Sequence, residues 1–242
     1  MSLRFRLFLL VLLIGWAAAL VGSYSRALAD WEQPLRLGSS MLLVLLAWGT
    51  RLEYRSARLY GLAGGVAVGM TLGCLGDFVM GEVLTWMPSP VLSGMILFGL
   101  GHLAYQVGCE LAWRRLAKVR PRRWWLAVLA WQVVNWLAWG WIVYPAVRHH
   151  ELIWPALAYG ALLAGTAGVM SGLMFEARIF APMAVGAALF LFSDLMIAVR
   201  LFQNQSWPEP LIWATYGPGQ MLIVAGTALA VAHAERNARP EA

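Results

Sequence analysis

Residues 179–200 read IFAPMAVGAALFLFSDLMIAVR, an apolar run that carries one acid, Asp194, before it ends at Arg200. A membrane-spanning helix needs about 20 predominantly apolar residues, so this run predicts a span. A second run, residues 59–81, reads LYGLAGGVAVGMTLGCLGDFVMG and carries Asp77. A carboxylate in hydrocarbon costs roughly 3 kcal/mol or more unless it is paired, neutralised or facing water. Both aspartates are therefore candidate functional residues.

The composition predicts an integral membrane protein. The 242-residue chain is 61% hydrophobic and only 12% charged, whereas a soluble domain has roughly 25% charged residues. We expect an all-α fold, a polytopic bundle of transmembrane helices that forms a single domain over residues 1–242. Charged and proline-containing segments divide it into eight expected spans, near residues 7–22, 35–50, 59–81, 90–113, 124–144, 152–174, 179–200 and 210–233.

The basic residues predict the orientation of this bundle, because cytoplasmic loops carry an excess of Lys and Arg. With the N-terminus in the cytoplasm, all of the 18 Lys and Arg residues, Lys118 and Arg239 included, fall on the cytoplasmic side, except Arg26, Arg36, Arg148 and Arg200. We therefore expect both termini in the cytoplasm, in a bacterial inner membrane. The basic run at residues 114–123 is read as membrane anchoring, so no nucleic-acid partner is expected.

The first span has two interpretations. Arg4 and Arg6, the apolar run that follows, and Ala27-Leu28-Ala29 resemble a cleavable signal peptide. An even number of helices fits the distribution of basic residues better, so we expect a retained helix. The loops between spans are short, which predicts antiparallel neighbours in one bundle. Small residues recur at close-packing spacings, as at Gly61, Gly64, Gly65, Gly69 and Gly73, and at Gly160, Gly165, Gly168 and Gly172.

Polar residues gather on two further spans. Tyr105 lies three positions after His102, and Gln106 lies four after it, so they share one helical face that must look into the bundle. Tyr216 and Gln220 also share a face, and Gly217-Pro218-Gly219 between them is expected to bend the last span, beside a cavity.

The depths of these groups agree with one another. At about 1.5 Å per residue, Asp77, Asp194 and Tyr216 lie roughly 8–9 Å below the outer boundary, and His102 lies near 18 Å. Each group also has a structural interpretation, as a buried hydrogen-bonding residue that links helices. For the two aspartates at matched depth, a functional role is favoured. The other histidines, His149, His150 and His233, are expected in loops or at a helix end, so no metal site is predicted.

With these residues identified, the chain resembles the lysoplasmalogenase family, also called YhhN-like, over nearly its whole length. This family consists of eight-span proteins whose characterised members hydrolyse the vinyl ether bond of lysoplasmalogens. The resemblance rests on an ordered set of short motifs: Gly76-Asp77, Gly101-His102 with Tyr105, Tyr159, Phe192-Ser193-Asp194, and Tyr216 with Gly219-Gln220. One departure concerns the second span, where Gln33-Pro34-Leu35 stands in place of the common Lys-Pro-Leu; Arg36 is a candidate substitute for that lysine in headgroup recognition.

The resemblance implies an alkenyl ether hydrolase that converts a lysoplasmalogen into a fatty aldehyde and glycerophospho-ethanolamine or -choline. It implies a lysophospholipid substrate among membrane lipids, with no protein partner, cofactor or metal. The reaction needs an acid, an anion and a placed water, and two carboxylates in a low dielectric cannot both ionise easily. We expect Asp77, Asp194 and His102 to be catalytic. We expect the substrate or water to be positioned by Tyr105, Tyr159, Ser193, Tyr216 and Gln220.

Two rival functions remain open on the sequence. An intramembrane aspartyl protease also uses two aspartates, but its usual Tyr-Asp and Gly-x-Gly-Asp motifs are missing around Asp194 and Asp77. A proton-coupled transporter or small-molecule-binding membrane protein would use Asp and His as a relay. It predicts pH-dependent flux without chemical change of the lipid.

Overall fold

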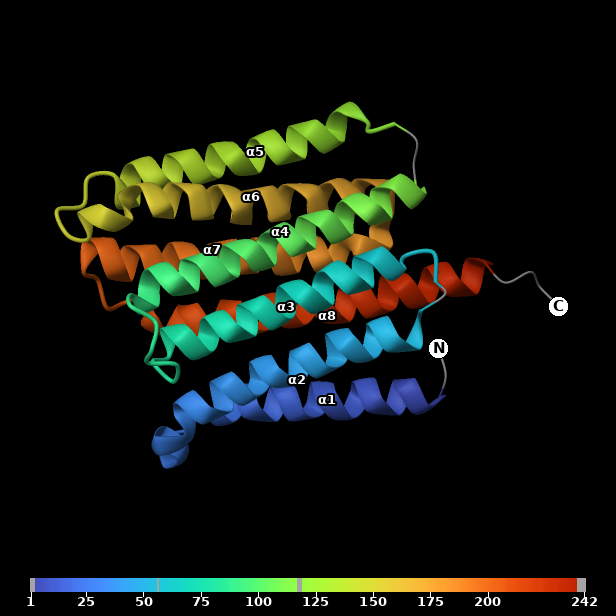
Figure 1. The fold of residues 1–242 in the computed structure, drawn as a ribbon, viewed down its shortest axis with the longest axis horizontal. Coiled ribbons are helices and arrows are strands. Elements are labelled where there is room, and N and C mark those ends of the chain that lie inside the picture. The colour runs from blue at the N-terminus through green and yellow to red at the C-terminus, as the bar shows by residue number, and fades with distance from the viewer. Residues whose placement is uncertain (1–2, 56, 117–118, 239–242) are drawn as a thin grey trace.

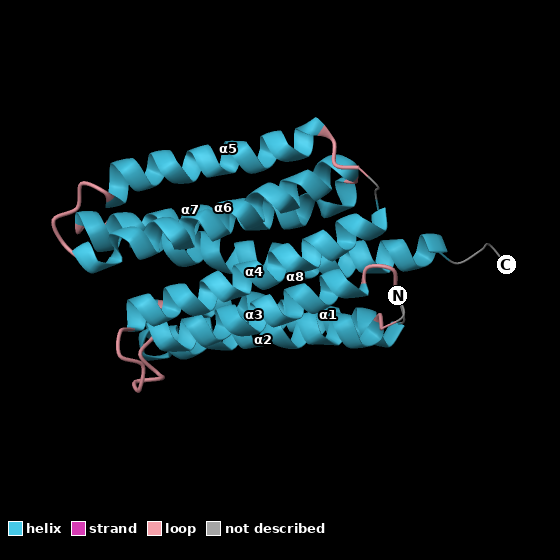
Figure 2. Cartoon of the chain, turned by 45° about the horizontal axis from the view of Figure 1, so that its top comes forward, coloured by secondary structure: helices cyan, strands magenta, loops and turns pink. Residues whose placement is uncertain are grey.

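The structure is a computed structural model that describes residues 3–55, 57–116 and 119–238. These residues form helices joined by short loops and contain no strand (Figure 2). The expected all-helical fold is confirmed. In the described part of the chain there are eight long helices: α1 (Leu3–Gly22), α2 (Glu32–Glu53), α3 (Tyr60–Met80), α4 (Pro90–Leu116), α5 (Arg122–Ala138), α6 (Ile153–Glu176), α7 (Ala181–Gln203) and α8 (Glu209–Ala238). Lys118 and Arg239 lie outside the described residues.

Each long helix covers one expected span, with ends that differ by a few residues. The largest difference is in α5, whose α-helical geometry ends at Ala138. The chain continues as a π-helical segment, η2 (Trp139–Val143), in which the backbone N–H of Tyr144 donates to the carbonyl of Trp139 over 2.9 Å. Three short 3₁₀ segments lie at helix ends: η1 (Arg26–Trp31), η3 (His150–Leu152) and η4 (Arg178–Phe180).

The last span is one continuous helix, α8, that contains Pro218, and Tyr216 beside this proline lines a cavity, as expected. Proline removes one backbone donor, and the surrounding helix is held by close packing against α7. A Cβ built on Gly219 would lie 3.0 Å from the carbonyl oxygen of Gly186. Because neither Gly219 nor Gly186 carries a side chain, α7 and α8 approach closely along the stretch that contains Pro218.

The helices lie side by side, and the chain reverses direction at each loop (Figure 1). α1 begins and α8 ends at the same end of the bundle. α3 is in contact with α2, α4 and α8, and α7 is in contact with α6 and α8. α5 packs mainly on α6 and lies at the edge of the bundle. Asp77, Asp194 and Tyr216 lie on α3, α7 and α8, and α8 packs against both α3 and α7.

Small residues bring the helices together, as the sequence predicts. A Cβ on Gly65 would lie 2.6 Å from both the carbonyl oxygen of Ala104 and the Cα of Gly108. A Cβ on Gly168 would lie 2.7 Å from the Cα of Val128. Backbones at this separation leave no room for a methyl group, so these glycines set the α3–α4 and α5–α6 distances.

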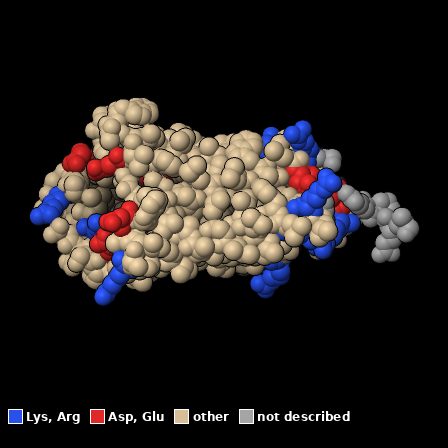
Figure 3. Space-filling model, turned by 90° about the horizontal axis from the view of Figure 1, so that it is seen from below, with Lys and Arg blue, Asp and Glu red and all other residues tan. Residues whose placement is uncertain are grey.

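Six of the described helical segments are long and apolar enough to cross a membrane: residues 3–22, 60–80, 90–116, 122–143, 150–176 and 178–203. The chain is therefore a multi-pass helical membrane protein in outline. α2 and α8 are not among the six, and each carries charged residues near both of its ends. On the face drawn in Figure 3, charged side chains gather toward the two ends of the bundle, and other residues form the belt between them.

Candidate functional site

A cavity of about 730 Å³ opens at the end of the bundle where α1 joins α2, α3 joins α4, and α7 joins α8. Its walls come from α2 through α8 and are mostly apolar. Both sequence-predicted aspartates line it. The apolar wall residues include Met80, Val91, Met95, Phe98, Ile142, Val143, Leu163, Leu191, Leu195, Ile197, Ala198, Leu201, Phe202 and Ile212.

Asp77 is held on one wall of this cavity by two hydroxyl groups. It is buried on α3, with 7% of its surface exposed. The Tyr216 hydroxyl donates to Oδ1 over 2.7 Å, and the Ser40 hydroxyl donates to Oδ2 over 2.6 Å. Both oxygens of the carboxyl group are therefore satisfied, and distances of this kind are typical of charge-assisted hydrogen bonds.

Gln220 completes a ring of side chains around Asp77. One turn of α8 separates it from Tyr216, which places both on the helix face that packs against α3. Its amide nitrogen donates to the Tyr216 hydroxyl oxygen over 2.5 Å, and its amide oxygen lies 3.4 Å from the Ser40 hydroxyl. The ring crosses three helices, since Ser40 lies on α2 and Asp77 lies on α3.

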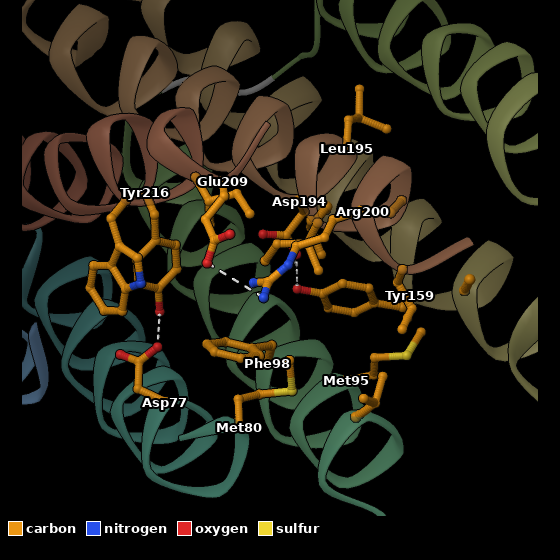
Figure 4. A pocket seen from close by; sticks show the side chains of 18 of the residues that line it. Asp77, Met80, Met95, Phe98, Tyr159, Asp194, Leu195, Arg200, Glu209 and Tyr216 are labelled. Atoms are coloured by element: carbon orange, nitrogen blue, oxygen red, sulfur yellow. Dashed lines mark hydrogen bonds and ion pairs between the residues drawn. The ribbon is translucent and has the colours of Figure 1, made fainter. Parts of the chain in front are cut away.

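Asp194 is held on another wall of the cavity, and its surroundings are different. It is half-buried on α7, where the hydroxyl of Tyr159 from α6 donates to Oδ2. Its Oδ1 makes no hydrogen bond to a side chain or backbone group of the described chain. Figure 4 shows the two aspartates apart from each other, Asp77 beside Tyr216 and Asp194 beside Tyr159. No hydrogen bond among the described residues joins the two carboxyl groups.

The mouth of the cavity carries charges of both signs. The Arg36 guanidinium lies 2.5 Å from the Glu32 carboxylate and stacks over the rings of Trp213 and Tyr24 at 5.2 and 5.6 Å from their centroids. Its Nε is buried without a hydrogen-bond partner among the described residues. Arg200 lies 3.4 Å from Glu209 across the α7–α8 connection.

Two other residues near the mouth bear on the sequence predictions. Gln33, the residue that departs from the expected Lys-Pro-Leu motif, lines the cavity and donates to the carbonyl of Gly81. Arg148 does not line the cavity; it donates to the side chain of Asn204 over 3.0 Å. Of Arg26, Arg36, Arg148 and Arg200, the residues that line the cavity are Arg36 and Arg200.

His102 lies behind the cavity wall. It is buried on α4 with its Nδ1 3.0 Å from the Thr166 hydroxyl, and its Nε2 has no partner among the described residues. Its ring is edge-on to Tyr105, Phe190 and Tyr159 at centroid distances of 5.6, 4.8 and 6.5 Å. The structure thus places His102 beside a residue that binds Asp194, but outside the cavity itself.

Three more predicted site residues do not line the cavity. The Tyr105 hydroxyl faces the sulfur of Met70 at 3.9 Å, and Ser193 donates to the carbonyl of Ile212 over 3.1 Å, which links α7 to α8. Gln220 reaches the site only through Tyr216 and Ser40. Of the eight predicted residues, those that line the cavity are Asp77, Tyr159, Asp194 and Tyr216.

Sequence reasoning missed Ser40 and Phe98. Ser40 lies in the stretch RLGSSMLLVLL, where a serine in an apolar helix is most simply read as bonded to its own backbone. That is what its neighbour Ser39 does, since it donates to the carbonyl of Arg36 over 2.6 Å. Phe98 forms part of the wall and lies edge-on to Tyr216 at 6.2 Å. Nothing in an apolar helix marks one phenylalanine among many.

No group of three or more His, Cys, Asp or Glu side chains with metal-binding geometry occurs within the described ranges. No curated protein and no solved structure matches the chain. The model of the YhhN family matches residues 35–227, which include Ser40, Asp77, Tyr159, Asp194, Tyr216 and Gln220. Because this match covers most of the sequence, the chain belongs to the YhhN family, the family of lysoplasmalogenases.

Proposed function

We propose that this protein hydrolyses the vinyl ether bond of lysoplasmalogens, releasing a fatty aldehyde and glycerophospho-ethanolamine or -choline. The observation that carries the proposal is the placement of Asp77 and Asp194 on two walls of one largely apolar cavity, each beside a tyrosine hydroxyl. Family membership supports the same class of reaction.

The chemistry needs two groups of this kind. Hydrolysis begins when an acid protonates the β-carbon of the vinyl ether, which produces an oxocarbenium ion. A carboxylate stabilises this cation and takes a proton from the water that attacks it, giving a hemiacetal that collapses to aldehyde and alcohol. A neutral carboxylic acid and a carboxylate in one site supply both functions.

The cavity also suits a single-chain lipid. Its apolar walls offer a place for the hydrocarbon chain, and the charged residues at its mouth offer contacts for a headgroup. In this proposal a guanidinium, from Arg36 or Arg200, binds the phosphate. Tyr159 and Tyr216 each donate their hydrogen to an aspartate, so their oxygens position the water or the glycerol hydroxyls by accepting hydrogen bonds from them. His102 acts from behind the wall through its ring contact with Tyr159.

We further propose that all eight helices cross the membrane, with both termini in the cytoplasm of a bacterial cell and the protein in the inner membrane. α2 and α8 are less apolar than the other helices, but their polar residues Ser40, Tyr216 and Gln220 face the interior of the bundle. Both helices also pack against α3, which supports their place among the spans. The cavity mouth then faces the outer leaflet, from which a lysolipid would enter.

The decisive experiment is mass spectrometry of a mixed lysolipid panel incubated with purified protein. The panel contains vinyl ether, alkyl ether and ester lysolipids with ethanolamine and choline headgroups. We expect aldehyde release from the vinyl ether lipids by the wild type, and loss of that release in Asp77→Asn and Asp194→Asn proteins that remain folded. Cleavage of a transmembrane peptide, or proton-coupled flux without lipid turnover, would overturn the proposal in favour of a protease or a transporter.

A further inference from the structure

The two aspartates differ in the number of donors that reach them. Asp77 accepts two hydrogen bonds, at 2.6 and 2.7 Å, whereas Asp194 accepts one, from Tyr159. An ionised carboxylate accepts hydrogen bonds at both oxygens, while a carboxylic acid keeps one oxygen as a donor. The hydrogen-bond pattern around Asp77 therefore suits the ionised form better than the pattern around Asp194.

The donor direction at Asp77 is fixed by Gln220. The Gln220 amide nitrogen is 2.5 Å from the Tyr216 oxygen, so its N–H occupies a lone pair of that hydroxyl. The Tyr216 hydrogen is then directed to Asp77. Ser40 is 2.6 Å from Asp77 and 3.4 Å from Gln220, so its single hydrogen goes to the nearer acceptor. Both contacts deliver a hydrogen to the carboxyl group.

Charged side chains do not account for the difference. Within the described residues, the arginines that line the cavity are engaged with other acids: Arg36 with Glu32 and Arg200 with Glu209. Neither aspartate forms an ion pair with a described Lys or Arg. The remaining acid in the wall, Asp30, lies at the mouth. Besides burial, the two aspartates differ in the number of hydroxyl donors, since two reach Asp77 and one reaches Asp194.

We infer that Asp77 is the ionised carboxylate of the site and that Asp194 is the proton-bearing acid. Ser40 is a positioning residue, whose hydrogen bond to Asp77 stabilises the ionised form of that carboxyl group. The inference rests on the proposed function for its chemical role. Ser40 acts through Asp77 and is not among the residues that line the cavity. The acid proton of Asp194 resides on Oδ1, because Oδ2 accepts the hydrogen of Tyr159.

These roles close the proton cycle. Asp194 gives its proton to the β-carbon, and water adds to the oxocarbenium ion while Asp77 takes a proton from that water. In the second stage Asp77 returns this proton to the leaving glycerol oxygen as the hemiacetal C–O bond breaks. Asp194 accepts the hydroxyl proton as the aldehyde forms. One water is consumed, and both carboxyl groups regain their starting states.

Infrared spectroscopy of the purified protein without substrate tests the inference independently of activity. A buried carboxylic acid gives a C=O band that shifts in D₂O, and the exposed acids are ionised at neutral pH. We expect this band to disappear in Asp194→Asn and to remain in Asp77→Asn. As a second pair, Asp194→Glu should move the band, whereas Asp77→Glu should leave it in place. A band that follows Asp77, or that survives both changes, overturns the inference.

Ser40→Ala tests the positioning role, with Ser39→Ala as its matched control. Ser39 is an adjacent buried serine that bonds to the backbone of its own helix. We expect Ser40→Ala to shift the carboxylate bands of Asp77 and to lower kcat roughly tenfold, because Asp77 loses one of its two donors. Ser39→Ala should do neither. Unchanged bands in Ser40→Ala, or the same shift in both variants, overturns the role of Ser40. Failure of wild-type hydrolysis would instead refute the proposed function and leave the spectral result intact.

Discussion

Tyr159 on α6 donates a hydrogen bond to Asp194 on α7, and its ring lies edge-on to His102 on α4. One tyrosine therefore joins the cavity to the buried histidine behind it. In the proposed function, His102 acts on the site through this ring contact without reaching the substrate.

Tyr159→Phe should lower kcat about fivefold while the fold is retained, because a hydrogen bond of about 1 kcal/mol is lost and the ring contact with His102 remains. The measurement is aldehyde release at saturating substrate. Tyr60→Phe is the control, since Tyr60 lies near the other end of the bundle beneath Arg51. Equal effects from the two variants would contradict a specific role for Tyr159.

Arg36→Gln should raise KM for the lysolipid about tenfold or more and change kcat little, because a charge-assisted contact to phosphate is worth roughly 1.5–3 kcal/mol. Arg36 lines the cavity and its Nε lacks a protein partner among the described residues. Arg148→Gln is the control: it removes the same charge at the same end of the bundle, but Arg148 binds Asn204 and does not line the cavity. It should leave KM unchanged, and a matching rise would mean that only general surface charge matters.

Gly65→Ala should destabilise the bundle by about 1–3 kcal/mol, because the added methyl meets the α4 backbone at 2.6 Å and the helices must separate. Gly38→Ala is the control within another helix, where no atom lies within 4 Å of the new Cβ. There alanine should stabilise the helix by about 0.5–1 kcal/mol. Thermal unfolding in detergent measures both. A Gly65→Ala protein that melts at the wild-type temperature would contradict the close-packing role.

The helices could be predicted well because the features that indicate a helix lie within a single segment. These features are the length of an apolar run, the charged residues that interrupt it and the spacing of glycines. The sequence also singled out Asp77 and Asp194 as candidate site residues, since a carboxylate among apolar residues stands out whatever surrounds it, and both line the cavity. The pairing of Tyr216 with Gln220 followed from helical spacing alone. The close packing of α8 against α7 around Pro218 was not visible in the sequence.

What the sequence lacked was the identity of neighbours across helices. Ser40 and Asp77 are 37 residues apart and meet only because α2 packs against α3. His102 shows the converse, since it shares a face with Tyr105 and yet points to Thr166 on α6 instead of the cavity. Helical spacing predicts which residues share a face of one helix. Which residues of other helices contact that face depends on the order of the helices in the bundle.

Labelling from outside the cell tests the proposed orientation. In a background without native cysteines, Gln205→Cys in the exposed α7–α8 loop and Val119→Cys in the exposed segment before α5 lie at opposite ends of the bundle. An impermeant maleimide should react with Cys at position 205 in intact cells, and at position 119 only after the membrane is opened. This follows because described arginines gather at the end that contains residue 119, and basic residues are retained in the cytoplasm. The reverse pattern would place the cavity mouth on the cytoplasmic side, and the lysolipid would then have to come from the inner leaflet.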